Sequence, residues 1–422
     1  MPARSTSWTE TGRRRGAAAL ALAAALIALA AAAPAVSAKT VRVFAMNPHL
    51  DIAWMESRDT FRAKMLALAD RSLRGDGAPL VRSGADDMAS HRLGNERDLV
   101  VWPEDIGLFA ALTGERGRPA RESGSLEGSI LTLATIMGPQ NAHYAPKFPD
   151  AANRPLPVRL TLLSLTDTFA RVAVETFAEM ASRYRVWLEA SVIMAQEWQV
   201  VCNDRDAFNA ASPPRLPTGQ LCQEENPQKV QQLGDPFEPE RDYVYEAVTG
   251  RVSNMALVFD PTGRLHSRQV KAYITPIESP GVGLDLVPGE VSDGLSAVRT
   301  PVGTLGFVTS KDAWMPDVLA KLDQGRVDLL VQPEFFVGDL VGPEEGMWAP
   351  DTFLGSGYNA MLRMPSVETV AAPSLAGNIF NFSADAQGFL ALRPRTPGAR
   401  RGHLVGQPGS PGLIPGPWVV PD

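Results

Sequence analysis

The sequence has few of the residues that hold metals. It contains only two cysteines, Cys202 and Cys222, and five histidines. Because a structural zinc site takes a full tetrahedral set of Cys or His ligands, this composition argues against one. The "HLDIAW" segment, His49–Trp54, offers a single His-x-Asp pair, which does not make a metal site. We expect neither a metal nor another cofactor.

Positive charge is also scarce. The chain has 40 Lys and Arg against 47 Asp and Glu, and its net charge is −7. This balance argues against a nucleic-acid-binding protein. The sequence lacks the G-x-S-x-G segment of a standard α/β-hydrolase. The glycine-containing "GVGLDLVPG" lacks the dinucleotide-binding fingerprint. The composition, 45% hydrophobic and 21% charged, is that of a soluble globular protein.

The first 38 residues are typical of an export signal. Arg13–Arg15 precede the uncharged run "GAAALALAAALIALAAAA", and "APAVSA" follows, with small residues at Val36 and Ala38. We predict a signal peptide over residues 1–38, cleaved after Ala38, and hence a periplasmic or secreted protein without a stable membrane span. The alternative is an uncleaved anchor. The sequence leaves open whether the Sec or the twin-arginine route is used.

Export changes the meaning of the two cysteines. In an oxidising compartment, Cys202 and Cys222 can close a loop. Such a bridge would contribute about 3 kcal/mol through loop entropy. The alternative is two unpaired thiols.

Beyond residue 38, apolar runs with strand character alternate with runs of helical spacing. We predict strands at Thr40–Met46 and Arg185–Ala195, a strand stopped by proline at Asp98–Glu104, and a strand running into an Asp-Pro-Thr-Gly turn at Asn254–Leu265. Helices are predicted at Ser57–Arg74 and Leu160–Tyr184. Repeated strand–helix–strand succession predicts an α/β layered fold. We expect a domain over residues 39–392 and a polar surface insertion at about 197–245. The Gly- and Pro-rich residues 393–422 predict an irregular tail.

Four segments each place a polar residue at or beyond the end of a predicted strand. They are "VVWPED" with Glu104, "LVFDPTGRLHSRQVKAYITPIE" with Lys271 and Glu278, "VGTLGFVTSKDAWMPD" with Ser310 and Asp312, and "VDLLVQPEFF". Ligands of layered α/β folds collect at strand ends, because helices cover the faces of the sheet. These side chains are therefore candidates for one shared site.

Together the four segments resemble the motifs of the carbon–nitrogen hydrolase (nitrilase) superfamily over about Thr40 to Leu392. That family has a Glu after a Pro at a strand end, as in "WPED", and a Lys beyond an Asp-x-x-Gly turn, as in "FDPTGRLHSRQVK". Its "G-x-x-x-C-x-D-x-x-x-P" motif matches "GFVTSKDAWMP" except at the cysteine, and "DLLVQP" matches its next strand. The resemblance implies a four-layer α-β-β-α sandwich.

The resemblance also implies roles. Glu104 would be the general base, Lys271 would stabilise the oxyanion, and Ser310 would stand at the position of the nucleophilic cysteine. Glu278 would orient the lysine region, and Asp312 matches the motif's aspartate. The implied partner is a small amide, nitrile or carboxylate, and the family's habit of assembly implies a homo-oligomer.

Serine at the nucleophile position changes the chemistry. An alcohol is far less acidic than a thiol, so a lone carboxylate is a poor base for it. A pair of Ser310 with Lys271 is conceivable, whereas Lys311 would point to the opposite face of a strand. "VVCND" at Cys202 imitates the cysteine motif, but it precedes Lys271 and the family places its cysteine after the lysine.

Three hypotheses follow. The chain is an exported hydrolase of amides or nitriles that uses Glu104, Lys271 and Ser310. Alternatively, it is a non-catalytic relative that binds an amide- or carboxylate-bearing ligand in the same pocket. In the third, only a scaffold for interactions is retained. We favour the hydrolase, because both Glu104 and Lys271 are present.

Overall fold

The computed structural model describes most of the chain between residues 39 and 420. The described residues are 39–74, 98–238, 240–281, 283–292, 295–335, 356–380, 382–384, 388–393, 402–405, 412–413 and 417–420. The predicted signal peptide, residues 1–38, lies outside them. No helix among the described residues combines the length and apolar character needed to cross a bilayer.

Strand β1 (Lys39–Asn47) belongs to a mixed sheet with the order β18-β1-β3-β4-β8-β9, in which β19 also pairs with β1. β3 (Asp98–Val101) and β4 (Trp187–Ala195) run parallel to β1. β8 (Val252–Phe259) is antiparallel to β4, and β9 (Leu265–Val270) returns antiparallel to β8. Every residue of β4 and β8 is buried, which explains their nearly continuous apolar sequence.

A second mixed sheet has the order β10-β11-β12-β13-β16-β17. Its central strands β11 (Thr304–Phe307), β12 (Leu329–Val331) and β13 (Thr369–Ala372) are parallel. β10 (Val298–Arg299) and β16 (Gly388–Leu392) pair antiparallel at either side of them.

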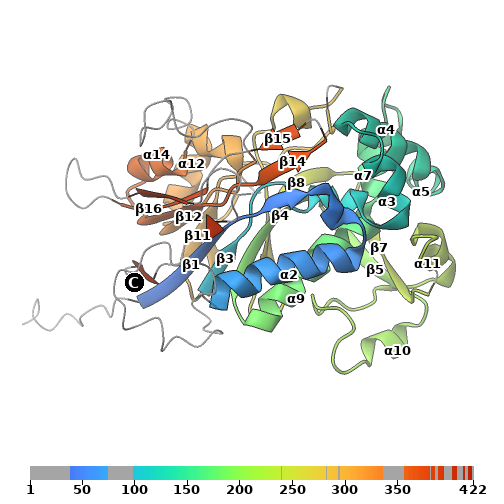
Figure 1. Cartoon of the computed structure of the whole chain (residues 1–422), viewed down its shortest axis with the longest axis horizontal. Coiled ribbons are helices and arrows are strands. Elements are labelled where there is room, and N and C mark those ends of the chain that lie inside the picture. The colour runs from blue at the N-terminus through green and yellow to red at the C-terminus, as the bar shows by residue number, and fades with distance from the viewer. Residues whose placement is uncertain are drawn as a thin grey trace, which may run out of the picture. The chain divides into compact units, whose positions relative to one another are not determined.

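Among the described residues, three hydrophobic cores define the layers. One core joins the two sheets: Val43 and Leu99 from the first pack with Phe307 and Leu329 from the second. Another lies between the first sheet and helices that include α2 (Arg58–Arg74) and α9 (Glu175–Tyr184). The third lies between the second sheet and α12 (Pro316–Gln324) and α14 (Gly357–Arg363). Figure 1 shows α12 and α14 beside β12 and β16. The predicted α-β-β-α sandwich is confirmed.

Further helices and short strands surround these layers. They are β2 (His49–Asp51), η1 (Ile52–Met55), η2 (Leu108–Leu112), α3 (Gly114–Arg121), α4 (Leu126–Ile136), α5 (Gly138–Tyr144), α6 (Pro149–Ala152), β14 (Ala376–Ile379) and β15 (Phe382–Ala384). β2, β14 and β15 form a small sheet of their own.

The predicted helix Leu160–Tyr184 is not continuous. Its residues form α7 (Val158–Ser164), α8 (Thr166–Phe169), a π-helical turn η3 (Ala170–Val174) and α9. The spacing of apolar residues predicted a helix, but the segment is buried on nearly all sides and is not amphipathic: of residues 160–184 only Glu179, Ser182 and Arg183 are not buried. Such spacing also does not report local changes of helical winding.

The segment that we expected to be a surface insertion is folded. β5 (Trp198–Cys202), β6 (Glu224–Glu225) and β7 (Tyr243–Ala247) form a separate sheet, with α10 (Arg205–Asn209) and α11 (Pro227–Leu233) between them. β5 and β7 pair antiparallel, and Val200, Val201 and Tyr245 are fully buried. The segment therefore extends the core between the first sheet and its helices.

Short strands also occur where we expected an irregular tail. β17 (Gly402–Val405) pairs with β16, and β18 (Gly412–Leu413) pairs with β1, as does β19 (Pro417–Val420). Glycine and proline content predicted no strand there. Pairing with a sheet edge satisfies the backbone whatever the side chains are, so composition alone missed these strands.

Candidate active site

A buried lysine joins two glutamates at one edge of the first sheet. Lys271 Nζ lies 2.7 Å from Glu104 Oε1 and 2.8 Å from Glu278 Oε2. All three residues are at most 3% exposed. The structure thus brings together residues that are far apart in the sequence and that we had selected as strand-end candidates.

The ends of two strands place Glu104 and Lys271. Beyond β3, the Trp102 N–H donates to the Glu189 carbonyl at 3.0 Å, and then Pro103, which has no N–H, ends the pairing. Lys271 directly follows β9, and its N–H donates to the Asn254 carbonyl at 2.9 Å. Since β3 and β9 run in the same direction, both side chains emerge at the same edge.

Glu278 is fixed by a short helical turn, η4 (Pro276–Glu278). Its Oε2 accepts hydrogen bonds from the Thr275 N–H at 2.7 Å and the Thr275 hydroxyl at 2.9 Å, in addition to the one from Lys271. This reciprocal capping arrangement holds the carboxylate toward the lysine.

Asn254 connects the two glutamates, and sequence reasoning missed it. Its Nδ2 donates to Glu104 Oε1 at 2.8 Å and to Glu278 Oε1 at 3.0 Å. Asn254 lies inside the buried strand β8. A buried amide needs polar partners. Asn254 directly precedes the apolar run "MALVF", and this polar residue in an otherwise apolar strand was the signal that could have revealed it.

The charges of this group favour an ionised lysine. Burial alone would lower the pKa of Lys271, but the charges of Glu104 and Glu278 raise it above its ordinary value. Burial acts to raise the pKa of Glu278, yet Lys271 lowers it overall. For Glu104, burial is the larger effect and raises the pKa. One ammonium therefore shares two carboxyls, of which Glu278 is the more readily ionised.

Ser310 begins a tight turn after β11. It is the first residue of η5 (Ser310–Trp314), and its φ of +47° lies in the left-handed region. Its N–H donates to the Pro333 carbonyl at 3.1 Å, which places Ser310 beside Glu334, whose pKa its hydroxyl lowers. Within the described residues no hydrogen bond joins Ser310 to Glu104 or Lys271. A non-glycine residue in this conformation is a common feature of functional sites.

Glu334 and its neighbour Phe335 link Ser310 to the Lys271 group. The Phe335 N–H donates to Glu104 Oε2 at 3.2 Å. Glu334 is half-buried, and burial, followed by the charge of Glu104, raises its pKa to about 8. Lys271 lowers it, as do hydrogen bonds from Ser310 and Gln332. The segment "VQPEFF" was a strand-end candidate, but its glutamate was not singled out.

Asp312 ties the Ser310 turn to the chain beyond Lys271. Its carboxylate accepts from the Ala272 N–H at 3.1 Å and from the Tyr273 N–H at 2.8 Å. Burial raises the pKa of Asp312 to about 7 despite these donors. Asp312 therefore holds the Ser310 turn against the backbone that follows Lys271.

Asp105 adds a further carboxyl beside Glu104. It is buried, with a φ of +60°, and burial raises its pKa well above the ordinary value. No group of His, Cys, Asp and Glu side chains suited to a metal ion is found among the described residues.

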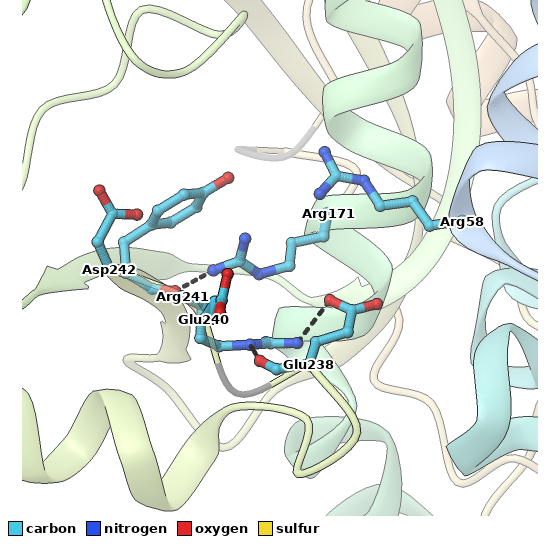
Figure 2. A pocket seen from close by; sticks show the side chains of 7 residues that line it. Arg58, Arg171, Glu238, Glu240, Arg241 and Asp242 are labelled. Atoms are coloured by element: carbon cyan, nitrogen blue, oxygen red, sulfur yellow. Dashed lines mark hydrogen bonds and ion pairs between the residues drawn. The ribbon is translucent and has the colours of Figure 1, made fainter.

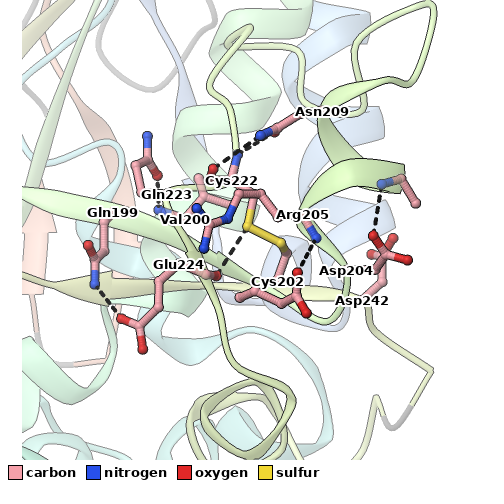
Figure 3. Close-up of a disulfide and its surroundings, with 12 residues drawn as sticks. Gln199, Val200, Cys202, Asp204, Arg205, Asn209, Cys222, Gln223, Glu224 and Asp242 are labelled. Carbon is pink, nitrogen blue, oxygen red and sulfur yellow. Dashed lines mark hydrogen bonds between the residues drawn. A yellow bond between two sulfur atoms is a disulfide. The ribbon is translucent and has the colours of Figure 1, made fainter.

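The two cysteines are bonded to each other outside this group. A disulfide joins Cys202, at the end of β5, to Cys222, with their Cα atoms 5.9 Å apart. Figure 3 shows the Asn209 side chain against the backbone of Cys222, whose N–H donates to Asn209 Oδ1 at 2.8 Å. Cys202 is thus no free thiol.

A separate hollow of about 490 Å³ lies near the start of β7. Figure 2 shows charged side chains of both signs around it, among them Arg58, Arg171 and Arg241. These arginines are paired internally: Arg241 and Arg171 both bind Asp167, and Arg58 binds Glu175. The hollow is therefore lined by structural ion pairs.

No family model matches the sequence, and no curated protein matches it. Among solved structures, similar ones include a cysteine-to-serine mutant of the Nesterenkonia AN1 amidase from the nitrilase superfamily, with 13% identity, a TM-score of 0.43, and coverage of 90% of this chain and 91% of that chain. The carbon-nitrogen hydrolase of Helicobacter pylori G27 is 11% identical with a TM-score of 0.44, and the match covers 89% of this chain and 88% of that chain. Saccharomyces cerevisiae Nit3, of branch 10 of the nitrilase superfamily, is 10% identical with a TM-score of 0.44, and the match covers 89% of this chain and 90% of that chain. The site described above follows from the layers and contacts of this chain and not from these similarities.

Proposed function

We propose that this chain is an exported carbon–nitrogen hydrolase that cleaves a small amide or nitrile with Ser310, Lys271 and Glu104. The main support is the buried Lys271 ammonium, which lies between Glu104 and Glu278 at the strand edge near the Ser310 turn. Buried ion pairs cost desolvation and add little stability. A costly charged group at a ligand-collecting edge is typical of a functional site.

Lys271 is suited to stabilise negative charge on a substrate. An ammonium has three N–H donors, and Glu104 and Glu278 take two of them. The third would donate to the carbonyl oxygen as it becomes an oxyanion. In a buried site this interaction is much stronger than in water.

Ser310 would supply the nucleophile. Its Oγ would attack the carbonyl carbon of an amide, the C–N bond would break, and ammonia or an amine would leave. Water would then hydrolyse the ester on Ser310 and release the acid. The motif resemblance assigns the general-base role to Glu104, and Glu278 and Asp312 would hold Lys271 and the Ser310 turn in position.

An oxidising location fits the covalent structure. The first 38 residues have the pattern of an export signal, and the Cys202–Cys222 bond is of a kind that persists outside the cytosol. We therefore propose a periplasmic or secreted protein. A homo-oligomer also remains our proposal.

One observation favours a second candidate, a non-catalytic protein that binds an amide or a carboxylate. Ser310 lies beside Glu334, and among the described residues it makes no hydrogen bond to Glu104, the base that the resemblance implies. A serine without a working base would leave a pocket that recognises an amide without turning it over.

Ammonia release from a panel of amides and nitriles separates these candidates. The purified chain from Lys39 onward should release ammonia, and Ser310→Ala and Glu104→Gln should abolish it. Ser310→Cys should remain active or gain activity, because a thiol is ionised more easily. Ser164→Ala is a matched control: this buried hydroxyl bonds to Asn141 Oδ1 at 2.7 Å, and its loss should leave release unchanged.

Absence of release from both the wild-type and the Ser310→Cys proteins would refute the hydrolase. If small amides or acids then raised the melting temperature, the ligand-binding candidate would be supported. Without either effect, the scaffold hypothesis would remain.

A further inference from the structure

Two parallel strands hold Ser310 and Glu334 side by side. β11 and β12 pair with Phe307 opposite Val331. The ladder continues past both strands, since the Val308 N–H donates to the Val331 carbonyl at 3.0 Å and the Ser310 N–H to the Pro333 carbonyl at 3.1 Å. This register brings Ser310 next to Glu334, near enough for its hydroxyl to lower the pKa of the Glu334 carboxyl.

Glu334 is itself firmly positioned. Its backbone N–H donates to the Pro373 carbonyl, and its carbonyl accepts from the Leu375 N–H, both at 3.0 Å. Its carboxylate also accepts a hydrogen bond from the Gln332 amide. The Gln332 oxygen accepts from the Gly357 N–H, which orients the amide nitrogen toward Glu334.

In Glu104, by contrast, both carboxylate oxygens already accept hydrogen bonds from other groups. Oε1 accepts from Lys271 at 2.7 Å and from Asn254 at 2.8 Å. Oε2 accepts from the Phe335 N–H at 3.2 Å. To take a proton from Ser310, Glu104 would have to approach a hydroxyl that already faces another carboxylate.

We infer that Glu334, and not Glu104, is the catalytic carboxylate that exchanges a proton with Ser310, while Glu104 positions Lys271. This inference rests on the proposed hydrolase function and changes the identity of its base. A base in direct contact is what an alcohol nucleophile requires, and a serine replacing a cysteine would need one.

The electrostatics support this assignment. Burial raises the pKa of Glu334 to about 8, and a general base works best with a pKa near the working pH. The groups that face this carboxylate are Glu104, Lys271, Ser310 and Gln332. Glu104 and Lys271 have opposite charges and stay in their buried pair, so Glu334 is the carboxyl beside Ser310 that is expected to titrate near neutral pH. Asp312, whose pKa is about 7, faces the backbone N–H groups of residues 272 and 273 instead.

The proton balance of the reaction closes with one carboxylate. Ionised Glu334 takes the Oγ proton while Oγ bonds to the amide carbon, and the oxyanion forms facing Lys271. As the C–N bond breaks, Glu334 returns the proton to the leaving nitrogen, and an ester remains on Ser310. Water then attacks the ester; Glu334 takes its proton and passes it to Oγ as the acid departs.

Diisopropyl fluorophosphate tests this step without a known substrate, because an activated serine attacks its phosphorus and expels fluoride. The rate of adduct formation at Ser310, followed by mass spectrometry, should rise with pH to a plateau with a midpoint near the pKa of Glu334, about 8. Glu334→Gln should slow labelling by about 100-fold or more and remove this pH dependence.

Two comparisons keep the test specific. Glu189→Gln makes the same carboxyl-to-amide change at a buried glutamate on β4 that bonds to Ser191 at 3.1 Å, and should label like the wild type. In the Ser310→Cys background, with iodoacetamide as the probe, Glu334→Gln should slow labelling by less than about tenfold, because a thiol loses its proton more readily than an alcohol.

The possible failures are distinguishable. If Ser310 is labelled and Glu334→Gln labels within threefold of the wild type, or if Ser310 is not labelled at all, the inference is wrong. If labelling depends on Glu334 but no amide or nitrile releases ammonia, the Ser310–Glu334 pair stands and the proposed hydrolase function fails.

Discussion

Lys271 Nζ lies 2.7 Å from Glu104 Oε1, although 167 positions separate the two residues in the chain. The contact requires that β3 and β9 end at the same edge of the first sheet. Glu278 completes the group from a turn only seven positions beyond Lys271. Removing the cation would leave two buried carboxyls without their shared partner.

We expect Lys271→Met to destabilise the fold by about 3–5 kcal/mol at pH 7, the usual cost of breaking a buried ion pair from one side. Without Lys271, the folded-state pKa of Glu278 would rise above its unfolded value, and that of Glu104, which burial already raises, would rise further. A carboxyl whose pKa is higher in the folded than in the unfolded state destabilises the fold more as pH rises. The difference in unfolding free energy between the wild type and Lys271→Met should therefore shrink toward acidic pH. Urea unfolding at a series of pH values measures this.

Lys147→Met is the control for that substitution. Lys147 also pairs with a glutamate, Glu246, but its side chain is 38% exposed. Its loss should cost no more than about 1 kcal/mol. Equal effects of the two substitutions at pH 7 would contradict a special role of burial at Lys271.

Asp312→Ala should destabilise the fold and disturb the site together. The change leaves the N–H groups of Ala272 and Tyr273 without their acceptor, at a cost of about 1–3 kcal/mol for each. It also frees the Ser310 turn from the chain beyond Lys271, so fluorophosphate labelling of Ser310 should slow.

Asp312→Asn keeps one acceptor oxygen and should lie between the alanine variant and the wild type. Asp317→Ala is the control, because Asp317 is exposed and accepts from the Tyr273 hydroxyl at 2.6 Å. Unchanged labelling in a folded Asp312→Ala protein would show that the turn does not need this anchor.

Sequence reasoning found the candidate residues that stand at strand ends and missed those that depend on strand pairing. Glu104 and Ser310 each follow an apolar run that ends in a visible break, and Lys271 follows the Asp-Pro-Thr-Gly turn by a few residues. Asn254 lies within such a run, and its contact with Glu104 follows from the pairing of β8 with its neighbours. Local sequence does not encode that register.

The same limit applies to Glu334 and to the fold. That Glu334 faces Ser310 follows from the parallel pairing of β11 with β12, two strands separated by a helix. The α/β character could be predicted from the alternating apolar runs, and the four α-β-β-α layers from the motif resemblance alone. The break of Leu160–Tyr184 at the π-helical turn could not, because the run of buried, largely apolar residues continues through it without a visible change.

The conformation of Ser310 predicts a difference between two inactive variants. With φ at +47°, a side chain at this position is strained by about 1 kcal/mol relative to glycine. Ser310→Gly should therefore be more stable than Ser310→Ala by about that amount. At the neighbouring Thr309, with φ at −68°, the order should reverse, because glycine there only adds freedom to the unfolded chain.

Thermal unfolding of these four variants provides the comparison. Ser310→Gly and Ser310→Ala with equal stability would indicate that the left-handed turn relaxes when the hydroxyl is lost. The strain would then belong to the hydrogen bond with Glu334 and not to the backbone alone.

Removal of the disulfide should affect stability without affecting Ser310. The bond spans a sequence separation of 20, for which loop entropy predicts a loss of about 3 kcal/mol. It lies in the β5-β6-β7 sheet, whereas Ser310 follows β11 of another sheet. A Cys202→Ser, Cys222→Ser double variant should unfold at lower urea but label normally below its transition. Loss of labelling in the folded variant would contradict this separation.

Glu246 should set part of the acid stability of the fold. Burial acts to raise its pKa, but hydrogen bonds from Lys147 and Lys229, with further ones from Gln199 and His143, lower it to about 2. Since the folded pKa is below the unfolded value, the ionised Glu246 stabilises the fold above about pH 4.5, and this contribution is lost as pH falls toward 2. Glu246→Gln should therefore be less stable than the wild type at pH 7, and the difference should narrow steadily below about pH 5. Urea unfolding from pH 7 to pH 3 measures it, with the exposed Glu122→Gln as the control. A difference that stays constant over this range would show that the amide loses packing and not charge, and that the lysines around Glu246 contribute no pH-dependent stability.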